Sequence, residues 1–313
     1  MLASCLLLLA LASCPQNANP TPAAELATES NAPTQTLWIG TWNIRFLGPS
    51  YDDSYEHREP AALGQYVADS GVSILALQEI GLTAGLDHRG NDTLDRVFSW
   101  MRENGHGSWQ YELFFTHRSP NQLTGVAWNS AHVTHQETLS VPLESGGASR
   151  YKATIWDRHP SAVKLSAGRG LTDIVVIPVH MKSNRASPGQ RPRLHRGLEA
   201  DLLVGALDDI MNHFWDEDIV ILGDFNTKHA REPAMRAFEK AGFLDLNAVD
   251  GGTYLSRRNP PFDRILFPRG QPEFHGAELY VMTIEGMSDA DFSRDYSDHR
   301  MAVAELTVLR DDD

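Results

Sequence analysis

Cysteine is scarce in this chain of 313 residues, since Cys5 and Cys14 are its only two cysteines and both lie near the N-terminus. The rest of the chain therefore cannot form an internal disulfide, and packing has to supply its stability. It also contains no Cys-x-x-Cys and no His-Glu-x-x-His segment. These absences argue against thiolate-zinc chemistry.

Glycine-rich phosphate loops are missing as well. No Gly-x-Gly-x-x-Gly segment and no Walker Gly-Lys-Ser/Thr segment occurs, so nucleotide-dependent chemistry is disfavoured. The chain also lacks a positive net charge, because its formal charge is -14 and its pI is near 5.3. A field of that sign repels phosphate-rich partners. A polyanionic substrate would have to be met by a local basic patch or by metal ions.

The N-terminal region contains an apolar run that is too short to span a membrane. Residues 6–12 read Leu-Leu-Leu-Leu-Ala-Leu-Ala, which is typical of an export signal; the alternative is a buried or frayed N-terminal helix. The segment Leu11-Ala12-Ser13-Cys14 resembles a bacterial lipoprotein box, which would attach the protein to a membrane through a lipid on Cys14. We predict an export signal at 1–14, a disordered tether at 15–35 and one folded domain at 36–310. The protein would then be lipid-anchored in the cell envelope or secreted.

Strand-like and helical patterns alternate along the predicted domain. Four short apolar runs are typical of buried strands: Leu37–Trp42, Ser73–Leu77, Asp173–Val179 and Asp218–Leu222. Five further runs with turn residues between them predict antiparallel strands: 111–116, 125–128, 133–141, 151–156 and 162–165. Helices are predicted at Glu59–Asp69, Asp92–Asn104, Arg196–His213 and Glu232–Ala241, the second capped by Asn91. The order of elements predicts two packed sheets flanked by helices.

Polar residues suited to metal and phosphate chemistry stand at the ends of apolar runs. They occur in Trp42-Asn43-Ile44, Leu77-Gln78-Glu79, Val179-His180, Gly223-Asp224-Phe225-Asn226 and Ser297-Asp298-His299. Because strands lie side by side in a sheet, residues at their ends can meet at one rim. Phosphodiester cleavage requires an oriented water and neutralisation of the charge that builds on phosphorus. The carboxylates of Glu79, Asp224 and Asp298 suit Mg2+, with Mn2+ or Ca2+ as alternatives.

Six segments together resemble the endonuclease/exonuclease/phosphatase superfamily. They are Trp42–Arg45, Leu77–Ile80, Val179–Ser183, Leu222–Asn226, Phe262–Ile265 and Tyr296–His299, all in the order of the family's motifs. The resemblance covers the chain from Thr41 to Leu306. It implies an α+β fold, a four-layer α/β sandwich of two packed, mainly antiparallel sheets flanked by helices. It also implies a metal-dependent hydrolase.

The resemblance also implies a role for each residue of these motifs. Glu79 would bind the catalytic metal, and Asn43 would hold a metal-bound water or the phosphate. Asp224 would orient and deprotonate the attacking water, and Asn226 would bind the phosphate and hold that carboxylate in place.

Two histidines and two further carboxylates complete the implied set. His299, fixed by Asp263, and His180 would stabilise the phosphorane and help to protonate the leaving oxygen. Asp298 would complete a metal position. No other cofactor is implied.

Taken one at a time, these residues have plainer explanations. A Glu or Asp at a strand end is usually a solvated turn residue, and Asn226 could be a turn former. His180 could be a core histidine, and Asp263 with Arg264 could be a surface ion pair worth about 0 to 1 kcal/mol. Their joint occurrence in one order favours the functional interpretation.

These motifs do not determine which phosphate ester is the substrate. A basic segment after His180 contains Lys182, Arg185, Arg191, Arg193, His195 and Arg196, and it could contact a polyanion or be a solvated loop. The segments Asn43–Gly48 and Phe262–Ile265 are most similar to pancreatic-type deoxyribonucleases, whereas Pro260–Leu266 also resembles a block of inositol phosphatases.

We carry three hypotheses about function. The first is an exported, metal-dependent endonuclease with nucleic acid as its substrate and no protein partner implied. The second is a phosphoesterase acting on phospholipid headgroups, like a sphingomyelinase, or on inositol phosphates. The third is a lipid-anchored binding module without activity, which the intact set of six segments argues against.

Overall fold

The computed structural model describes residues 35–48, 58–83, 90–115, 122–143, 155–185, 189 and 191–311. The predicted export signal at 1–14 and, except for Gln35, the predicted tether at 15–35 lie outside these residues. Residues Thr34–Asp313 form one compact unit. None of the helices in the described ranges has the length and apolar character needed to cross a bilayer.

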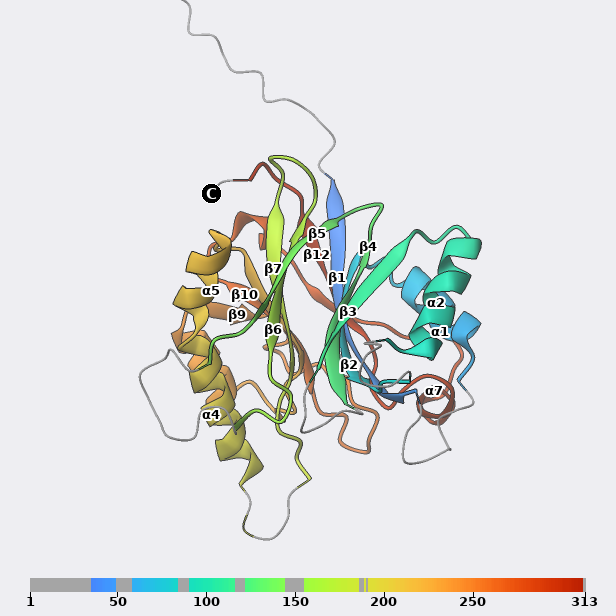
Figure 1. Cartoon of the computed structure of the whole chain (residues 1–313). Coiled ribbons are helices and arrows are strands. Elements are labelled where there is room, and N and C mark those ends of the chain that lie inside the picture. Colours follow the sequence, from blue (N-terminus) through green and yellow to red (C-terminus); the bar gives the residue numbers. More distant parts are fainter. Residues whose placement is uncertain are drawn as a thin grey trace, which may run out of the picture. The chain divides into compact units, whose positions relative to one another are not determined.

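Twelve strands in the described residues form two six-stranded sheets (Figure 1). The first sheet has the order β11-β12-β1-β2-β4-β3, with strands at Leu279–Val281, Ala302–Thr307, Thr36–Leu47, Ile74–Ile80, Leu123–Asn129 and Trp109–Phe114. The second has the order β5-β6-β7-β8-β10-β9, with strands at Thr134–Ser140, Ser161–Ser166, Asp173–His180, Ile219–Asp224, Asp263–Pro268 and Phe243–Asp245.

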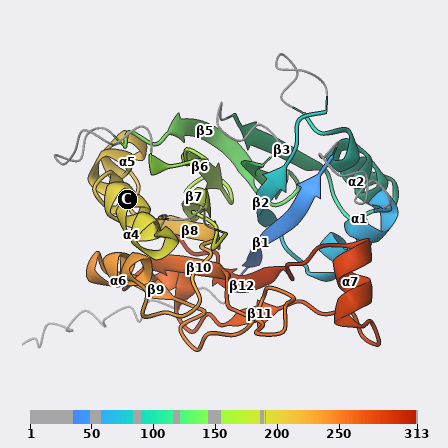
Figure 2. The ribbon, with the colours of Figure 1, turned by 90° about the horizontal axis from the view of Figure 1, so that it is seen from below.

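Helices cover the outer face of each sheet. Figure 2 shows α1 and α2 outside the first sheet, with α7 beside them, and α4, α5 and α6 outside the second. The helices span Pro60–Asp69 (α1), Asp92–Glu103 (α2), Pro192–Val204 (α4), Leu207–Phe214 (α5), Pro233–Lys240 (α6) and Asp289–Asp295 (α7). In each sheet one described strand pair is parallel, β1 with β2 and β7 with β8, and the other pairs are antiparallel. The predicted four-layer sandwich is confirmed.

Residue alternation along the strands explains the layers. In β1, Leu37 and Ile39 face a core between the two sheets, whereas Trp42 and Ile44 face the core beneath α1 and α2. Strand β7 follows the same rule, with Val176 between the sheets and Val175 toward α4 and α5. Both faces of these strands are buried, so the runs are apolar throughout instead of alternating with polar residues.

Two predicted elements differ from the structure. The helix predicted at Arg196–His213 begins earlier, at Pro192, because proline suits the first turn of a helix. It is also two helices, α4 and α5, separated at Gly205, a poor helix former. The strand predicted at 151–156 lies mostly outside the described residues, and Ile155 and Trp156 are not in a strand. The predicted cap is confirmed, because the Asn91 side chain accepts a hydrogen bond from Leu94 N at 2.9 Å.

Candidate active site

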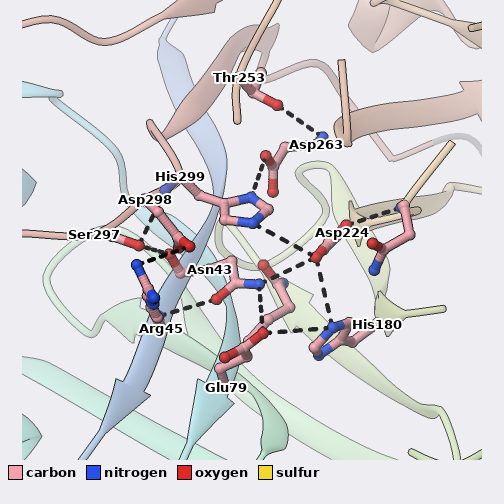
Figure 3. A network of polar contacts seen from close by, with 12 residues as sticks. Asn43, Arg45, Glu79, His180, Asp224, Thr253, Asp263, Ser297, Asp298 and His299 are labelled. Carbon is pink, nitrogen blue, oxygen red and sulfur yellow. Dashed lines mark hydrogen bonds and ion pairs between the residues drawn. The ribbon is translucent and has the colours of Figure 1, made fainter. Parts of the chain in front are cut away.

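Four of the predicted residues continue the series of side chains that lie between the two sheets. Asn43 follows Leu37 and Ile39 at alternate positions of β1, and His180 follows Ile174 and Val176 in β7. By the same alternation Asp224 and Asp263 share this face of β8 and β10. All four are at most 2% exposed. The inner core therefore ends in a polar cluster, which Figure 3 shows.

Glu79 reaches the same cluster by breaking the alternation of β2. In a regular strand it would share the outer face with Leu75 and Leu77. Its φ is 61°, and the pairing of β2 with β4 shifts register between Leu77 and Ile80. A left-handed residue other than glycine or asparagine costs about 1–2 kcal/mol, and such strain gathers at functional sites. It turns the Glu79 carboxylate toward Asn43.

Asn43 joins the two halves of the cluster. Its Nδ2 donates to Glu79 Oε1 at 3.2 Å and to Asp224 Oδ2 at 3.1 Å. His180 Nε2 lies 3.8 Å and 3.5 Å from the same two oxygens. Glu79 and Asp224 come from different sheets, so these contacts place the predicted metal ligand and the predicted base in one site.

His299 is held in one orientation by a carboxylate. Its Nδ1 lies 2.8 Å from Asp263 Oδ2, and its Nε2 lies 3.9 Å from Asp224 Oδ2. The Asp263 backbone N donates to Thr253 Oγ1 at 3.0 Å, which fixes the start of β10. Ser297 Oγ donates to the Asn43 carbonyl at 2.6 Å and accepts from His299 N at 3.1 Å. The last predicted motif is thereby tied to the first.

The pKa values of these groups are strongly perturbed. Burial raises the pKa of Asp224 to about 7, and the charges of Asp263 and Glu79 act in the same direction. Burial of the His299 ring works against its charged form, but Asp263 and Asp224 outweigh it and raise its pKa to about 10. Burial lowers the pKa of His180 well below its ordinary value, and the charges of Arg158 and His299 add to that effect. At neutral pH the site contains a protonated His299 and a neutral His180, and Asp224 is near the midpoint of its titration.

Backbone geometry around Asp224 explains the glycine before it and the asparagine after it. Gly223 has φ 148°, and a Cβ there would lie 2.0 Å from the Val179 carbonyl oxygen. Only glycine allows β7 and β8 to approach in this way. Asn226, at φ 54°, donates its backbone N–H to Asp224 Oδ1 at 2.8 Å and its Nδ2 to the Met181 carbonyl at 3.2 Å. Asn226 therefore fixes the Asp224 carboxylate, and its contact with phosphate stays a prediction.

Asp298 lies at the rim of the site. Its Oδ2 forms an ion pair with Arg45 at 3.0 Å, and among the described residues no hydrogen bond or ion pair joins it to Glu79. Its predicted role in metal binding stays a prediction.

The cluster contains oxygen donors that could bind a divalent cation. Within the described ranges, no group of three or more His, Cys, Asp or Glu side chains is arranged to hold a metal ion. Mg2+ does not require such a cage, since it keeps several waters and often binds through one or two carboxylates. The Glu79 carboxylate, 14% exposed, supplies oxygen ligands of the right kind. The Asn43 amide turns its Nδ2 toward Glu79 and Asp224, and its Oδ1 accepts from Arg45 N at 3.0 Å. The residues therefore fit a hydrated Mg2+ or Mn2+ ion.

A cleft of about 280 Å³ is lined in part by Glu79, His180, Asp224 and His299. Its walls include residues that the sequence analysis did not select: Phe46, Gln122, Arg158, Asn184 and Tyr254. Arg158, 7% exposed, donates a hydrogen bond to Gln122 Oε1. Its charge contributes to the lowered pKa of His180. Tyr254 stacks on Phe262 and lies against the His299 ring, with centroids 5.1 Å and 4.9 Å apart. Neither Arg158 nor Tyr254 belongs to a sequence motif that would have predicted its place in the cleft.

The basic segment that follows His180 is divided by the fold. Arg196 is 1% exposed and pairs with Glu232 at 2.6 Å, and Lys182 pairs with Asp157 at 2.8 Å. Arg185, Arg191 and Arg193 remain exposed. Neither alternative for this segment, a polyanion contact or a solvated loop, holds for Arg196, because a buried side chain on the inner face of α4 has to be paired.

No protein-family model and no curated protein matches the chain. Solved structures do match. An endonuclease/exonuclease/phosphatase family protein from Bacteroides thetaiotaomicron is 16% identical with a TM-score of 0.60, over 88% of this chain and 98% of that one. A Bacteroides vulgatus endonuclease/exonuclease/phosphatase is 15% identical with a TM-score of 0.58, over 87% and 99% of the two chains. TDP2 from D. rerio, complexed with single strand DNA product, is 13% identical with a TM-score of 0.51, over 88% and 99%.

The chain has the fold of the endonuclease/exonuclease/phosphatase superfamily. The resemblance stated from the six motifs is confirmed in the fold.

Proposed function

We propose that this chain is a divalent-metal-dependent phosphodiesterase, an endonuclease that hydrolyses DNA or RNA. The observation that carries the proposal is the convergence of Asn43, Glu79, His180, Asp224 and the Asp263–His299 pair on one cleft. Phosphodiester hydrolysis needs a base, an acid and charge stabilisation at one point, and these side chains supply all three. The shared fold of TDP2, whose structure was solved with a DNA product, supports nucleic acid as the substrate.

Asp224 is the base of the proposed reaction. Its Oδ1 accepts from Asn226 N and its Oδ2 accepts from Asn43, so its orientation is fixed. With a pKa of about 7 it can take a proton from a water as that water's oxygen bonds to phosphorus. His299, protonated and oriented by Asp263, donates a proton to the leaving oxygen as the phosphorus–oxygen bond breaks.

Neutral and cationic groups stabilise the charge on phosphorus. His180 remains neutral with its Nε2 turned toward Glu79 and Asp224, and Arg158 lines the same cleft. Glu79 would hold a divalent cation, which when bound supplies Lewis-acid stabilisation of the phosphate. Asn43 would hold the phosphate or a water of that cation.

A substrate panel tests this proposal. Purified protein with Mg2+ or Mn2+ should nick supercoiled plasmid, and EDTA should stop the reaction. The same preparation is offered single-stranded DNA, RNA, sphingomyelin and a phosphoinositide. If only the lipid or inositol substrates are hydrolysed, the protein is a lipid or inositol phosphoesterase and the endonuclease proposal is wrong. Binding of these compounds without turnover, under every metal tried, would leave only a binding module.

Export is a separate proposal that the sequence of residues 6–14 supports. Expressed in a bacterium, the chain should appear in the envelope fraction, and Cys14→Ser should release it from the membrane. Equal cytoplasmic recovery of both forms would contradict export and lipid attachment.

A further inference from the structure

A group of exposed basic residues, here called the basic rim, lies on the segments that lead from the cleft to α4 and α6. We define it as the exposed residues Arg185, Arg191, Arg193, Lys228 and Arg231. They come from three segments: the loop after β7, the start of α4 and the loop between β8 and α6. Figure 2 shows α4 and α6 side by side at this part of the unit.

A buried ion pair holds the three segments together. Arg196 of α4 donates to the Lys182 carbonyl at 3.0 Å and to Glu232 Oε2 at 2.6 Å. Glu232 Oε1 in turn accepts from Lys228 N at 2.8 Å. Asn184 Nδ2 also donates to the Asn226 carbonyl at 2.6 Å. The basic rim is therefore fixed relative to Asp224, because the same loops that carry it begin at the site.

Ion pairs among the described residues leave the charges of the rim without a partner. In the part of the chain that the structure describes, no ion pair involves any of the five rim side chains. The nearby carboxylates have other partners: Asp157 pairs with Lys182, Glu232 with Arg196, and Asp250 with Arg264. On a chain of formal charge -14, these five cations form a local positive field that the net charge of the protein opposes.

We propose that the basic rim binds the phosphate backbone of a nucleic-acid strand whose scissile phosphate lies in the cleft. This inference rests on the proposed endonuclease function and narrows it to an extended substrate. Arg185 lines the cleft itself, and the other four residues lie on the segments beyond it. A small phosphate ester occupying the cleft would leave those four cations without a role, whereas successive phosphates of a strand can reach them.

The experiment compares a polymer with a small substrate. The rim variant carries Arg191→Gln, Arg193→Gln, Lys228→Gln and Arg231→Gln. The matched control carries Arg169→Gln and Arg269→Gln, two exposed arginines at the opposite end of β7 and β10 from the site. Each protein is assayed in full length on a 20-nucleotide single strand and on bis(p-nitrophenyl) phosphate, over a range of salt concentrations.

We expect the ratio of kcat/KM on the strand to kcat/KM on the small ester to fall at least tenfold in the rim variant. The control should keep the wild-type ratio. The salt dependence of strand binding should also become shallower in the rim variant, by about 3 in the log–log slope for four lost contacts at ~0.7 each. An unchanged ratio with an unchanged salt slope would overturn the proposal.

Two further outcomes distinguish failure of the basic-rim proposal from failure of the proposed endonuclease function. If the wild type hydrolyses neither substrate, the endonuclease function fails. If the wild type hydrolyses both, and the rim variant instead loses only its binding to phosphatidylglycerol vesicles, the rim faces an anionic lipid surface and the nucleic-acid proposal is overturned.

Discussion

Replacing Asp263 by Asn is the sharpest perturbation of the His299 pair. The asparagine keeps an oxygen for the His299 Nδ1 hydrogen bond of 2.8 Å but removes the charge. Burial of the ring works against its charged form, yet Asp263 and Asp224 raise the pKa from 6.5 to about 10. At about 1.4 kcal/mol for a tenfold change in acidity, that difference corresponds to roughly 5 kcal/mol. Asp263 contributes more to this rise than Asp224 does, so its removal should lower the pKa of His299 toward the ordinary value of a histidine.

The same shift predicts the pH dependence of stability. The pKa of His299 is higher in the folded than in the unfolded protein, so its contribution is fully present below pH 6.5 and is lost as pH rises through about 10. The wild-type free energy of unfolding should therefore decline between pH 7 and 10, and Asp263→Asn should flatten the decline. At pH 7 the variant should lose about 3 kcal/mol, the lower end for a buried pair that loses a partner.

The assays are NMR titration of the His299 ring, urea unfolding at several pH values and single-turnover cleavage. We expect kcat to fall at least 100-fold, as for a lost acid group. If His299 titrates at the same pH in both proteins and the variant cleaves at the wild-type rate, the assignment of His299 as the oriented acid is wrong.

Three other predictions follow from the same site. Because burial raises the pKa of Asp224 to about 7 and only its ionised form accepts a proton, kcat/KM should rise with pH through about 7; a flat profile from pH 5 to 8 would exclude Asp224 as the base. Glu79→Gln should abolish Mg2+ binding in calorimetry and lower the rate at least ~100-fold; wild-type Mg2+ affinity in this variant would place the cation elsewhere. Gly223→Ala would put a Cβ 2.0 Å from the Val179 oxygen at φ 148°, so urea unfolding should show a loss of about 3 kcal/mol or more, whereas an unchanged midpoint would show that β7 and β8 can separate there.

Much of the architecture could be predicted because it follows from local patterns. The apolar runs at β1, β2, β7 and β8 are unbroken because both faces of each strand are buried. The polar residue that ends each run marks the end of the strand and of the core. Six motifs in the order of the family's motifs then indicated that the strand ends lie close together. The contacts among Asn43, Glu79 and Asp224 show that they do.

Other features depended on contacts between residues far apart in the sequence. Alternation alone would turn Glu79 to the outer face, and only the left-handed backbone at that residue brings it to Asn43. Arg158 and Tyr254 enter the cleft from segments without a motif. Arg196 looked like one more member of a basic loop, and its partner Glu232 lies 36 positions away. Such pairings have no local signal for a sequence analysis to detect.

A double-variant measurement tests most directly whether these distant segments work as one catalytic centre. His180→Ala, His299→Ala and the combination of both are compared in kcat/KM for metal-dependent cleavage of a DNA strand. Each single variant should lose at least ~100-fold, and the double variant should lose far less than the product of the two, because both histidines act on one phosphate. Wild-type rates in either single variant, or losses that multiply fully, would contradict a shared centre.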